Sequence, residues 1–272
     1  MSFVDSINAA TLPAAETSED LPVFWFFNGD KRRQEPGVFY MKDGALWDDP
    51  TPPWQAGERF PGEKGWQAEV LRIALLGYRQ QAFVSTSEDG RQSRRYLAEW
   101  EPGASFLNEI LCIAEGLGDD PIVWSCKGLT GKAVLGKGGM LQQYNGGLLS
   151  VARKLARQAH GPEAARKIPL HAFWLPIASD RDAQGRVIYT DTGHGSTVTL
   201  PALQLPAEIT EQTIDACYVG PERLEHLAEI RADFEASGWF ARRRGNVAET
   251  TEAVPSRPTT NETTDETAEM PF

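Results

Sequence analysis

Residues 67–100 read QAEVLRIALLGYRQQAFVSTSEDGRQSRRYLAEW, and this stretch decides the class of fold. Its first part, 67–85, carries β-branched and aromatic residues at a density that favours an extended strand. The tetrad Ser87-Glu88-Asp89-Gly90 has the composition of a turn, and 91–100 provides the returning strand. The sequence therefore predicts a long β-hairpin at the centre of a mainly β protein.

The segment after this hairpin is predicted to be helical over 105–117, because Phe106, Ile110 and Ile113 recur at three- and four-residue steps. Beyond it we expect a strand at 122–127, a turn and short return strand at 128–135, a glycine-rich loop at 136–147, a basic amphipathic helix at 148–159, strands within 168–177 and 185–200, and a helix at 221–239. The predicted pattern is β-dominated with three helices.

Composition divides the chain into three parts. Residues 1–20 are small, polar and acidic, and we expect a disordered arm there. The folded domain is predicted to span 21–245. From 246 to 272 the chain is dominated by Thr, Glu, Pro, Ser and Asn, so no packed core is expected and we predict a disordered tail for protein interaction.

The net charge of −11 is unevenly distributed. The arm contributes −4 and the tail −5, which leaves the body close to neutral at −2. Within the body, residues 121–160 contain six Lys and Arg and no Asp or Glu. One face of the domain is therefore predicted to be strongly positive.

Several classes of protein are disfavoured. No apolar run approaches the roughly 18 residues that cross a bilayer, and the N-terminus has no basic and apolar leader, so we expect a cytoplasmic protein without membrane contact. Cys112, Cys126 and Cys217 are odd in number and lack a Cys-x-x-Cys pair. This argues against disulfides and a zinc site, and indicates reduced thiols.

The C-terminus has the chemistry of a docking peptide. Its final apolar residues carry the terminal carboxylate and follow a short acidic stretch. A partner with an apolar pocket rimmed by Arg or Lys would bury the ring and clamp the carboxylate. The predicted partner-binding residues are Asp265, Glu266, Glu269, Met270, Pro271 and Phe272.

This acidic tail ending in Met-Pro-Phe resembles the tails of bacterial and phage single-stranded DNA-binding proteins. The resemblance covers about nine residues and the composition of the tail, and this tail has fewer acidic residues than the family's usual version. It implies a β-rich body containing an OB-fold-like barrel with additional strands and helices, of which 105–117 would be the helix between the third and fourth strands. It also implies a bacterial or phage-infected host cell.

Binding single strands without sequence preference requires aromatic side chains that stack on bases and a basic groove for phosphates. The long hairpin and the acid-free stretch supply both. The predicted DNA-binding residues are Tyr78, Arg79, Arg94, Arg95, Tyr96, Trp100, Trp124, Lys127, Lys132, Lys137 and Tyr144.

Rival chemistries find weaker support in the sequence. Gly131 to Gly138 nearly matches a phosphate-binding loop, but Gly138 replaces the hydroxyl that would hold magnesium. Asp191-Thr192-Gly193 copies the aspartic protease triplet once, and a turn between strands explains it better. The four histidines are scattered without metal-ligand spacing, and a Cys112 or Cys126 nucleophile has no local support.

We therefore expect a non-enzymatic protein without cofactor that protects single-stranded DNA during replication, recombination or repair. Its tail would recruit replication or repair proteins, and the chain is a possible homo-oligomer. The alternative is a protein-interaction adaptor that uses the same tail and binds no nucleic acid.

Overall fold

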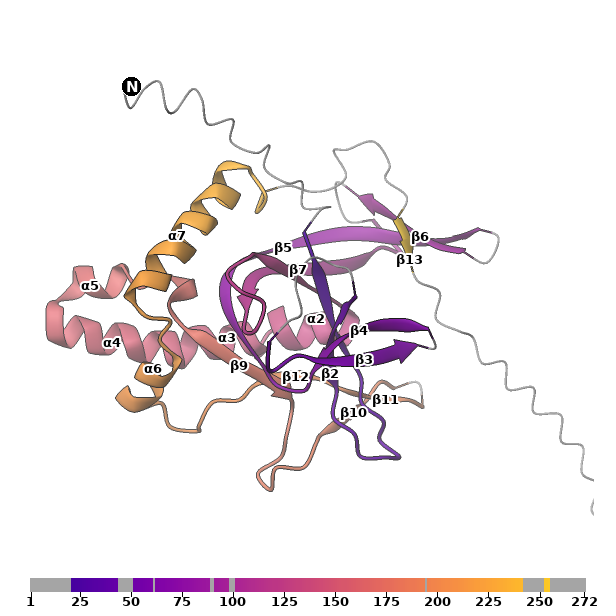
Figure 1. The fold of residues 1–272 in the computed structure, drawn as a ribbon, viewed down its shortest axis with the longest axis horizontal. Coiled ribbons are helices and arrows are strands. Elements are labelled where there is room, and N and C mark those ends of the chain that lie inside the picture. The colour runs from indigo at the N-terminus through magenta and orange to yellow at the C-terminus, as the bar shows by residue number, and fades with distance from the viewer. Residues whose placement is uncertain are drawn as a thin grey trace, which may run out of the picture.

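The computed structural model describes residues 21–43, 51–60, 62–88, 91–97, 101–193, 195–241 and 252–254 (Figure 1). The strands are β1 (Val23–Phe27), β2 (Val38–Lys42), β3 (Gln55–Phe60), β4 (Glu63–Ala68), β5 (Leu71–Glu88), β6 (Arg91–Leu97), β7 (Ser105–Ala114), β8 (Ile122–Lys127), β9 (Trp174–Ser179), β10 (Tyr189–Asp191), β11 (Thr197–Thr199), β12 (Pro201–Leu203) and β13 (Glu252–Val254). The helices are α2 (Gly128–Leu135), α3 (Met140–Gly146), α4 (Leu148–His160), α5 (Pro162–Arg166), the 3-10 turn η1 (Leu170–Ala172), α6 (Glu211–Cys217) and α7 (Pro221–Ala236).

One large mixed sheet organises the chain. Its hydrogen-bonded path runs β12-β9-β5-β7-β8-β1-β2-β4-β3, while β6 adds to β5 and β13 adds to β6. Strands β1 and β8 are parallel, and the other pairs of this sheet in the described chain are antiparallel. Strands β10 and β11 form a separate ribbon. The protein is thus a mixed α/β fold, which confirms the predicted mixture of strands and helices.

The sheet is open in the part of the chain that the structure describes, because β12 and β3 end its path. The predicted OB-fold-like barrel is therefore not closed by strand pairing among the described residues. Only Glu69 and Val70 separate β4 from β5, so a nearly continuous segment pairs with β2 through its first part and with β7 through its second. The sheet therefore bends strongly on itself without closing by hydrogen bonds.

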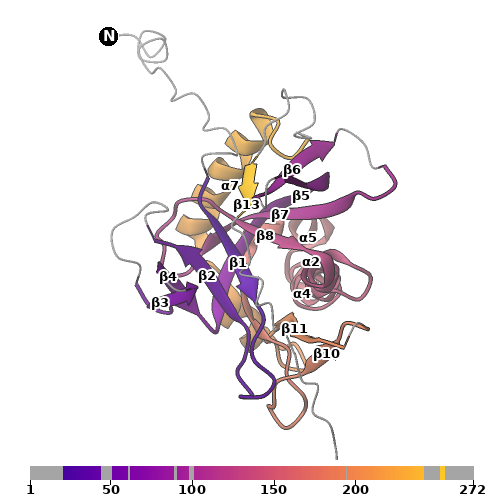
Figure 2. The same ribbon diagram turned by 90° about the vertical axis from the view of Figure 1, so that its right-hand side faces the viewer.

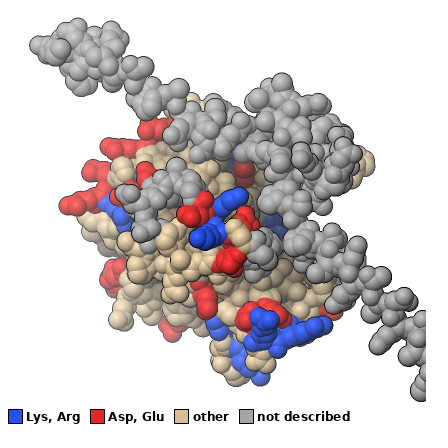
Figure 3. Space-filling model, turned by 45° about the vertical axis from the view of Figure 1, so that its right-hand side comes forward, with Lys and Arg blue, Asp and Glu red and all other residues tan. Residues whose placement is uncertain are grey.

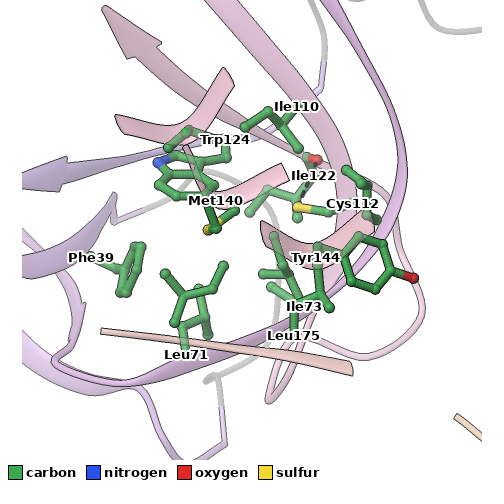
Figure 4. Packing of buried hydrophobic residues seen from close by; sticks show 14 of the residues in the cluster. Phe39, Leu71, Ile73, Ile110, Cys112, Ile122, Trp124, Met140, Tyr144 and Leu175 are labelled. Atoms are coloured by element: carbon green, nitrogen blue, oxygen red, sulfur yellow. Dashed lines mark hydrogen bonds between the residues drawn. The ribbon is translucent and has the colours of Figure 1, made fainter. Parts of the chain in front are cut away.

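The core has two clusters, because the central strands bury both faces. On β5, Ile73 and Leu75 point into the first cluster, while Ala74 and Leu76 point into the second. In Figure 4, Phe39 of β2, Trp124 of β8 and the other labelled residues of the first cluster surround a common interior. Helix α7 covers the second cluster, where Leu227 and Trp239 are almost fully buried.

Helices α2, α3 and α4, which we call the helical arm (128–160), follow β8 without a long connection. Figures 1 and 2 together show α2 and α4 nearly in line along one side of the sheet. Leu148, Leu149 and Ala152 bury one face of α4 against the first cluster. The cations of α4 lie on its exposed face, so this helix is amphipathic as the sequence predicted.

The predicted helix at 105–117 is wrong, because Ser105–Ala114 forms strand β7. Residues 107–114 are all buried, and β7 pairs with β5 on one side and β8 on the other. A fully apolar run that is buried on both faces loses the alternation typical of strands. Its apolar residues therefore also matched a helical spacing by chance.

The predicted turn, return strand and loop over 128–147 are also wrong, because this stretch forms α2 and α3. Helices α5 and α6 were not predicted. The long hairpin is confirmed by the β5–β6 pairing, although its first residues belong to β4 and to the turn before β5. The strand at 122–127 and the helices at 148–159 and 221–239 are confirmed within a few residues.

The N-terminal arm and most of the predicted tail lie outside the described residues. Within the tail, Glu252–Val254 forms the short strand β13, which pairs with Arg94, Ser93 and Gln92 of β6. This three-residue segment therefore adds a short strand to the edge of the sheet. Among the described helices, none combines the length and apolar character of a transmembrane span.

Candidate nucleic-acid interface

The helical arm gathers the positive charge of the body. Between 121 and 167 the only acid is Glu163, which pairs with Arg166 at 2.8 Å. Eight exposed cations occupy this stretch, namely Lys127, Lys132, Lys137, Arg153, Lys154, Arg157, Arg166 and Lys167. Among the described residues, none of the salt bridges involves Lys132, Lys137, Lys154 or Arg157. These four charges are therefore available to an anionic ligand.

The cations of α4 share one side of that helix. Arg157 lies one turn beyond Arg153 and Lys154, at spacings of four and three residues, so the three side chains lie on the same side of the helix. The guanidinium of Arg153 donates to the carbonyl of Ile168 at 3.0 Å, which fixes this end of the row. Lys132 on α2 and Lys137 in the connection to α3 precede these cations along the arm, so the positive charge is distributed over the length of the arm. An elongated polyanion matches such a distribution.

A second element of the interface is an exposed apolar patch beside α2. Tyr78 is 50% exposed on β5 and Phe106 is 41% exposed on β7. They lie on the same face of the two strands, since Tyr78 pairs with Ile110 and Phe106 with Ala82. We call Tyr78, Phe106 and the 38% exposed Leu129 of α2 the strand patch.

The strand patch is held next to the helical arm. Between Tyr78 and Phe106, the amide of Gln80 donates to Asn108 at 2.9 Å. Helix α2 approaches β7 so closely there that a Cβ on Gly131 would stand 2.3 Å from the Asn108 side chain. A larger residue at position 131 would therefore require the Asn108 side chain to move. Helix α2 therefore lies against β7 on the face that carries the two exposed aromatic rings.

Three predicted DNA-binding residues lie in the interior instead. Trp124 and Tyr144 are fully buried in the first cluster, and the Tyr144 hydroxyl donates to the Leu170 carbonyl at 2.6 Å. Arg79 is 4% exposed and is held by an ion pair with Glu109 at 2.6 Å. Neither buried ring can stack on a base in this conformation, and the charge of Arg79 is already neutralised. These three predictions are wrong because tertiary packing, which the local sequence does not show, places the side chains inward.

The remaining predicted residues divide into two groups. Tyr78, Lys127, Lys132 and Lys137 are exposed. Lys127 lies in register with Leu107, on the opposite face of the sheet from Tyr78. Arg94, Arg95 and Tyr96 lie on β6, and their side chains are outside the described part, as is the whole of Trp100. The tail residues 265–272 are outside it as well.

Sequence reasoning missed Phe106, Leu129 and the α4 cations as interface residues. Phe106 was assigned to the apolar stripe of a helix, which gave it a core role. The α4 cations carried a usable signal, because an amphipathic helix whose polar face holds only Lys and Arg as charged residues is unusual on an acidic protein.

The positive charge is not general to the surface. In Figure 3, acidic side chains predominate on the left of the face drawn, and basic side chains lie near its centre and at its lower edge, with acidic ones beside them. The loop between β1 and β2 lies at the bottom of the molecule in Figures 1 and 2 and carries Lys31, Arg32 and Arg33, all exposed. There Arg33 is shared by Asp30 at 3.7 Å and Glu35 at 3.8 Å. This loop, unlike the helical arm, carries acids among its cations.

The enzyme-like motifs have no matching geometry in the described residues. In the near match to a phosphate-binding loop, Gly131 to Leu135 is helical rather than a cradle of backbone amides. Asp191 ends β10 and accepts a bond from the amide of Gly193, which confirms a turn between strands. No cluster of three metal-binding side chains occurs among the residues described.

The cysteines also lack the environment of a nucleophile. All three are buried thiols. Burial raises the pKa of Cys126 to about 12 and moves the pKa of Cys112 still further above its usual range. Thiolate formation, on which cysteine reactivity depends, is therefore disfavoured at both positions.

His171 supplies a prediction about acid stability. It is 2% exposed, and neither ring nitrogen has a hydrogen-bond partner in the described structure. Burial, followed by the nearby charge of Arg231, lowers the pKa of His171 from 6.5 to about 4. The unfolded chain then binds the proton more readily, so the free energy of unfolding should fall by up to a few kcal/mol as the pH drops from about 6.5 toward 4. Urea titrations across this pH range should show that the free energy of unfolding falls more steeply with decreasing pH for the natural chain than for H171L. An equal dependence on pH in the two proteins would contradict the prediction.

No protein-family model, curated protein or solved structure matches this chain. Function therefore has to be inferred from its own geometry and charge.

Proposed function

We propose that this protein binds single-stranded DNA without sequence preference, through the helical arm and the strand patch. The observation that carries the proposal is the acid-free run 121–160 within a chain of net charge −11. Its apolar side chains pack into the core and its cations face outward. A protein that repels polyanions overall but concentrates exposed cations in one acid-free segment has a defined place for a phosphate backbone.

The strand patch supplies the second requirement of this function. Bases of a single strand expose π-faces, and stacking on aromatic side chains is worth roughly 1 to 3 kcal/mol per base. Tyr78 and Phe106 stand four residues apart along the ribbon, or about 13 Å at the usual rise of a strand. An extended strand that crosses both rings would continue toward the cations of α2. Duplex DNA, whose bases are already stacked, gains nothing from these rings.

An OB-type relationship is part of the same proposal. Strands β5, β7, β8, β1 and β2 are neighbours in that order, and the chain returns from β2 to β5 through β4. Helices α2, α3 and α4 follow β8, the third strand of the run β5-β7-β8, in the place where the family carries a helix. A partly open five-stranded barrel with this arrangement is compatible with an OB-fold. The docking role of the C-terminal tail is likewise proposed on its sequence.

The experiment is a titration of a labelled oligo-dT by fluorescence anisotropy at several salt concentrations. Anisotropy is preferable to tryptophan quenching, because Trp54, Trp124 and Trp239 are buried in the described structure. We expect the logarithm of the association constant to fall linearly with the logarithm of the salt concentration. The slope should be about −3 for four to five phosphate contacts. The absence of binding at low salt would overturn the proposal and favour the adaptor.

Tyr78 provides a specific prediction within this experiment. Replacing it with alanine should weaken oligo-dT binding by about 1 to 3 kcal/mol, because a stacking surface is lost while the charges remain. The slope against salt should stay unchanged. The matched control is Y218A, which removes another exposed tyrosine at 40% exposure, away from the strand patch. Equal losses for the two variants would contradict a stacking role for Tyr78.

A further inference from the structure

A small pocket of about 280 Å³ lies where α4, α5, α6 and α7 meet, in the group of helices at one end of the molecule in Figure 1. Its walls are mostly apolar and come from these helices and from the segment around η1, namely Ala152, Ala164, Ile168, Phe173, Ile214 and Leu224. The volume lies just below the range of pockets for drug-sized ligands. An occupant of amino-acid size therefore fits it better than a nucleotide or another large cofactor.

Two opposite charges border this apolar pocket. Lys167 directly follows α5, whereas Asp215 lies on α6, so the two side chains belong to different walls. Both residues are exposed. Among the described residues, none of the salt bridges involves Lys167 or Asp215, and the two do not pair with each other. One cation and one anion at the same pocket are therefore available to a ligand.

The other polar groups near the pocket are engaged within the protein. Arg153 donates to the carbonyl of Ile168 at 3.0 Å, which holds its guanidinium at the backbone. The amide of Lys167 donates to the carbonyl of Ala164 at 3.2 Å, and the amide of Tyr218 donates to that of Ile214 at 2.9 Å. A ligand in the pocket thus meets apolar walls and the two charged side chains.

A small zwitterion with an apolar side chain matches this lining. An anionic ligand would gain from Lys167 but would be repelled by Asp215, and a cationic ligand would meet the reverse situation. An uncharged apolar ligand would gain nothing from either charge. A free α-amino acid carries an ammonium and a carboxylate group on the carbon that bears its side chain, so it can use both charges and the cavity together.

We propose that the pocket between α4, α5, α6 and α7 binds a free amino acid with an apolar side chain. The side chain enters between Ile168, Ile214 and Leu224, the carboxylate lies toward Lys167 and the ammonium group lies toward Asp215. The ligand thereby connects α5 with α6. This inference does not depend on DNA binding, because neither the strand patch nor Lys132, Lys137, Lys154 or Arg157 lines the pocket.

Methyl NMR of the full chain titrated with L-leucine tests the proposal. The δ1 methyl groups of Ile168 and Ile214 should shift, whereas those of Ile110 in the core and Ile188 on the surface should not. For a ligand of this size we expect a dissociation constant of about 1 mM. A164F, which fills the cavity from a surface helix, should abolish the shifts while the Ile110 signal stays in place. Unchanged signals of Ile168 and Ile214 at about ten times that leucine concentration would overturn the proposal.

Leucine derivatives that lack one charge identify the role of each side chain. L-leucinamide, without the carboxylate, and N-acetyl-L-leucine, without the ammonium group, should each bind about fivefold more weakly than leucine. K167Q should weaken leucine but not leucinamide, and D215N should weaken leucine but strengthen N-acetyl-leucine. K64Q and E69Q, which remove an exposed cation and an exposed acid outside the pocket, are the matched controls and should leave all three affinities unchanged. Equal affinities of the natural chain for the three ligands would overturn recognition of a zwitterion and leave only an unselective apolar cleft.

Discussion

Reversing four charges on the helical arm, in the variant K132E/K137E/K154E/R157E, should lower the affinity for oligo-dT at least about 100-fold at low salt. Each phosphate contact on a single strand contributes about 0.7 to the slope of log affinity against log salt. Loss of four contacts should therefore flatten the slope by about 3. These side chains are exposed and unpaired among the described residues, so the fold should tolerate the changes. Anisotropy titrations at four or more salt concentrations measure both quantities.

The control for this variant must change the net charge equally. K31E/R32E/K64E/R181E reverses four exposed cations on the β1–β2 loop, on β4 and on the loop before β10. If only long-range attraction matters, both variants lose the same affinity. If the helical arm makes the phosphate contacts, the control variant keeps most of the slope of log affinity against log salt. Equal losses in the two variants would contradict the proposed interface while leaving DNA binding itself intact.

Removing the carboxylate of Glu109 should destabilise the protein by about 3 to 5 kcal/mol in E109A. Glu109 accepts bonds from Arg79 at 2.7 Å and from Gln81 at 2.6 Å, and the Arg79 and Glu109 side chains are 2% and 5% exposed. Without Glu109 the buried guanidinium loses this carboxylate partner, while its contacts with the Trp239 ring at 4.2 Å and the Trp239 carbonyl at 3.2 Å bring no opposite charge. Removing one partner of a buried ion pair is costly for this reason.

The matched variant replaces the whole network with apolar side chains. R79M/Q81L/E109L removes the charge together with its partners, so its cost should be well below that of E109A. Urea unfolding followed by circular dichroism provides both free energies of unfolding. A triple variant as unstable as E109A would show that the ionic network itself, rather than the avoidance of an unpaired charge, stabilises this region. Neither variant should alter the salt dependence of DNA binding if Arg79 has a structural role.

The burial of Arg79 illustrates where sequence-based prediction of the site failed. In sequence, Tyr78-Arg79 resembles a stacking ring beside a phosphate contact. In a strand, adjacent side chains point to opposite faces. The structure exposes Tyr78 and turns Arg79 beneath Trp239, which comes from a segment 160 residues further along the chain. No local pattern around residue 79 indicates that distant partner.

The prediction that Trp124 and Tyr144 contact DNA failed for a related reason. Each lies within the acid-free basic stretch 121–160, and aromatic residues in such a stretch are typical of nucleic-acid surfaces and of ordinary cores alike. Trp124 stacks on Phe24 at 5.9 Å because β8 and β1 are parallel neighbours. That pairing connects residues about a hundred positions apart, so it is a property of the sheet rather than of either strand.

The sequence by itself determined the features that depend on composition and on short-range periodicity. These are the partition of charge into acidic ends and a basic central stretch, the long hairpin, the amphipathic helix at 148–160 and the apolar C-terminal residues behind acids. Charge and helical spacing depend only on the identity of residues and their separation along the chain, so both can be read from a single sequence. Only the tertiary structure decided that 105–114 is a strand, that Arg79, Trp124 and Tyr144 are internal, and that Tyr78 shares a face with Phe106. The physical reason is that strand pairing and burial depend on contacts between distant segments, whose free energies outweigh the local preferences of the residues involved.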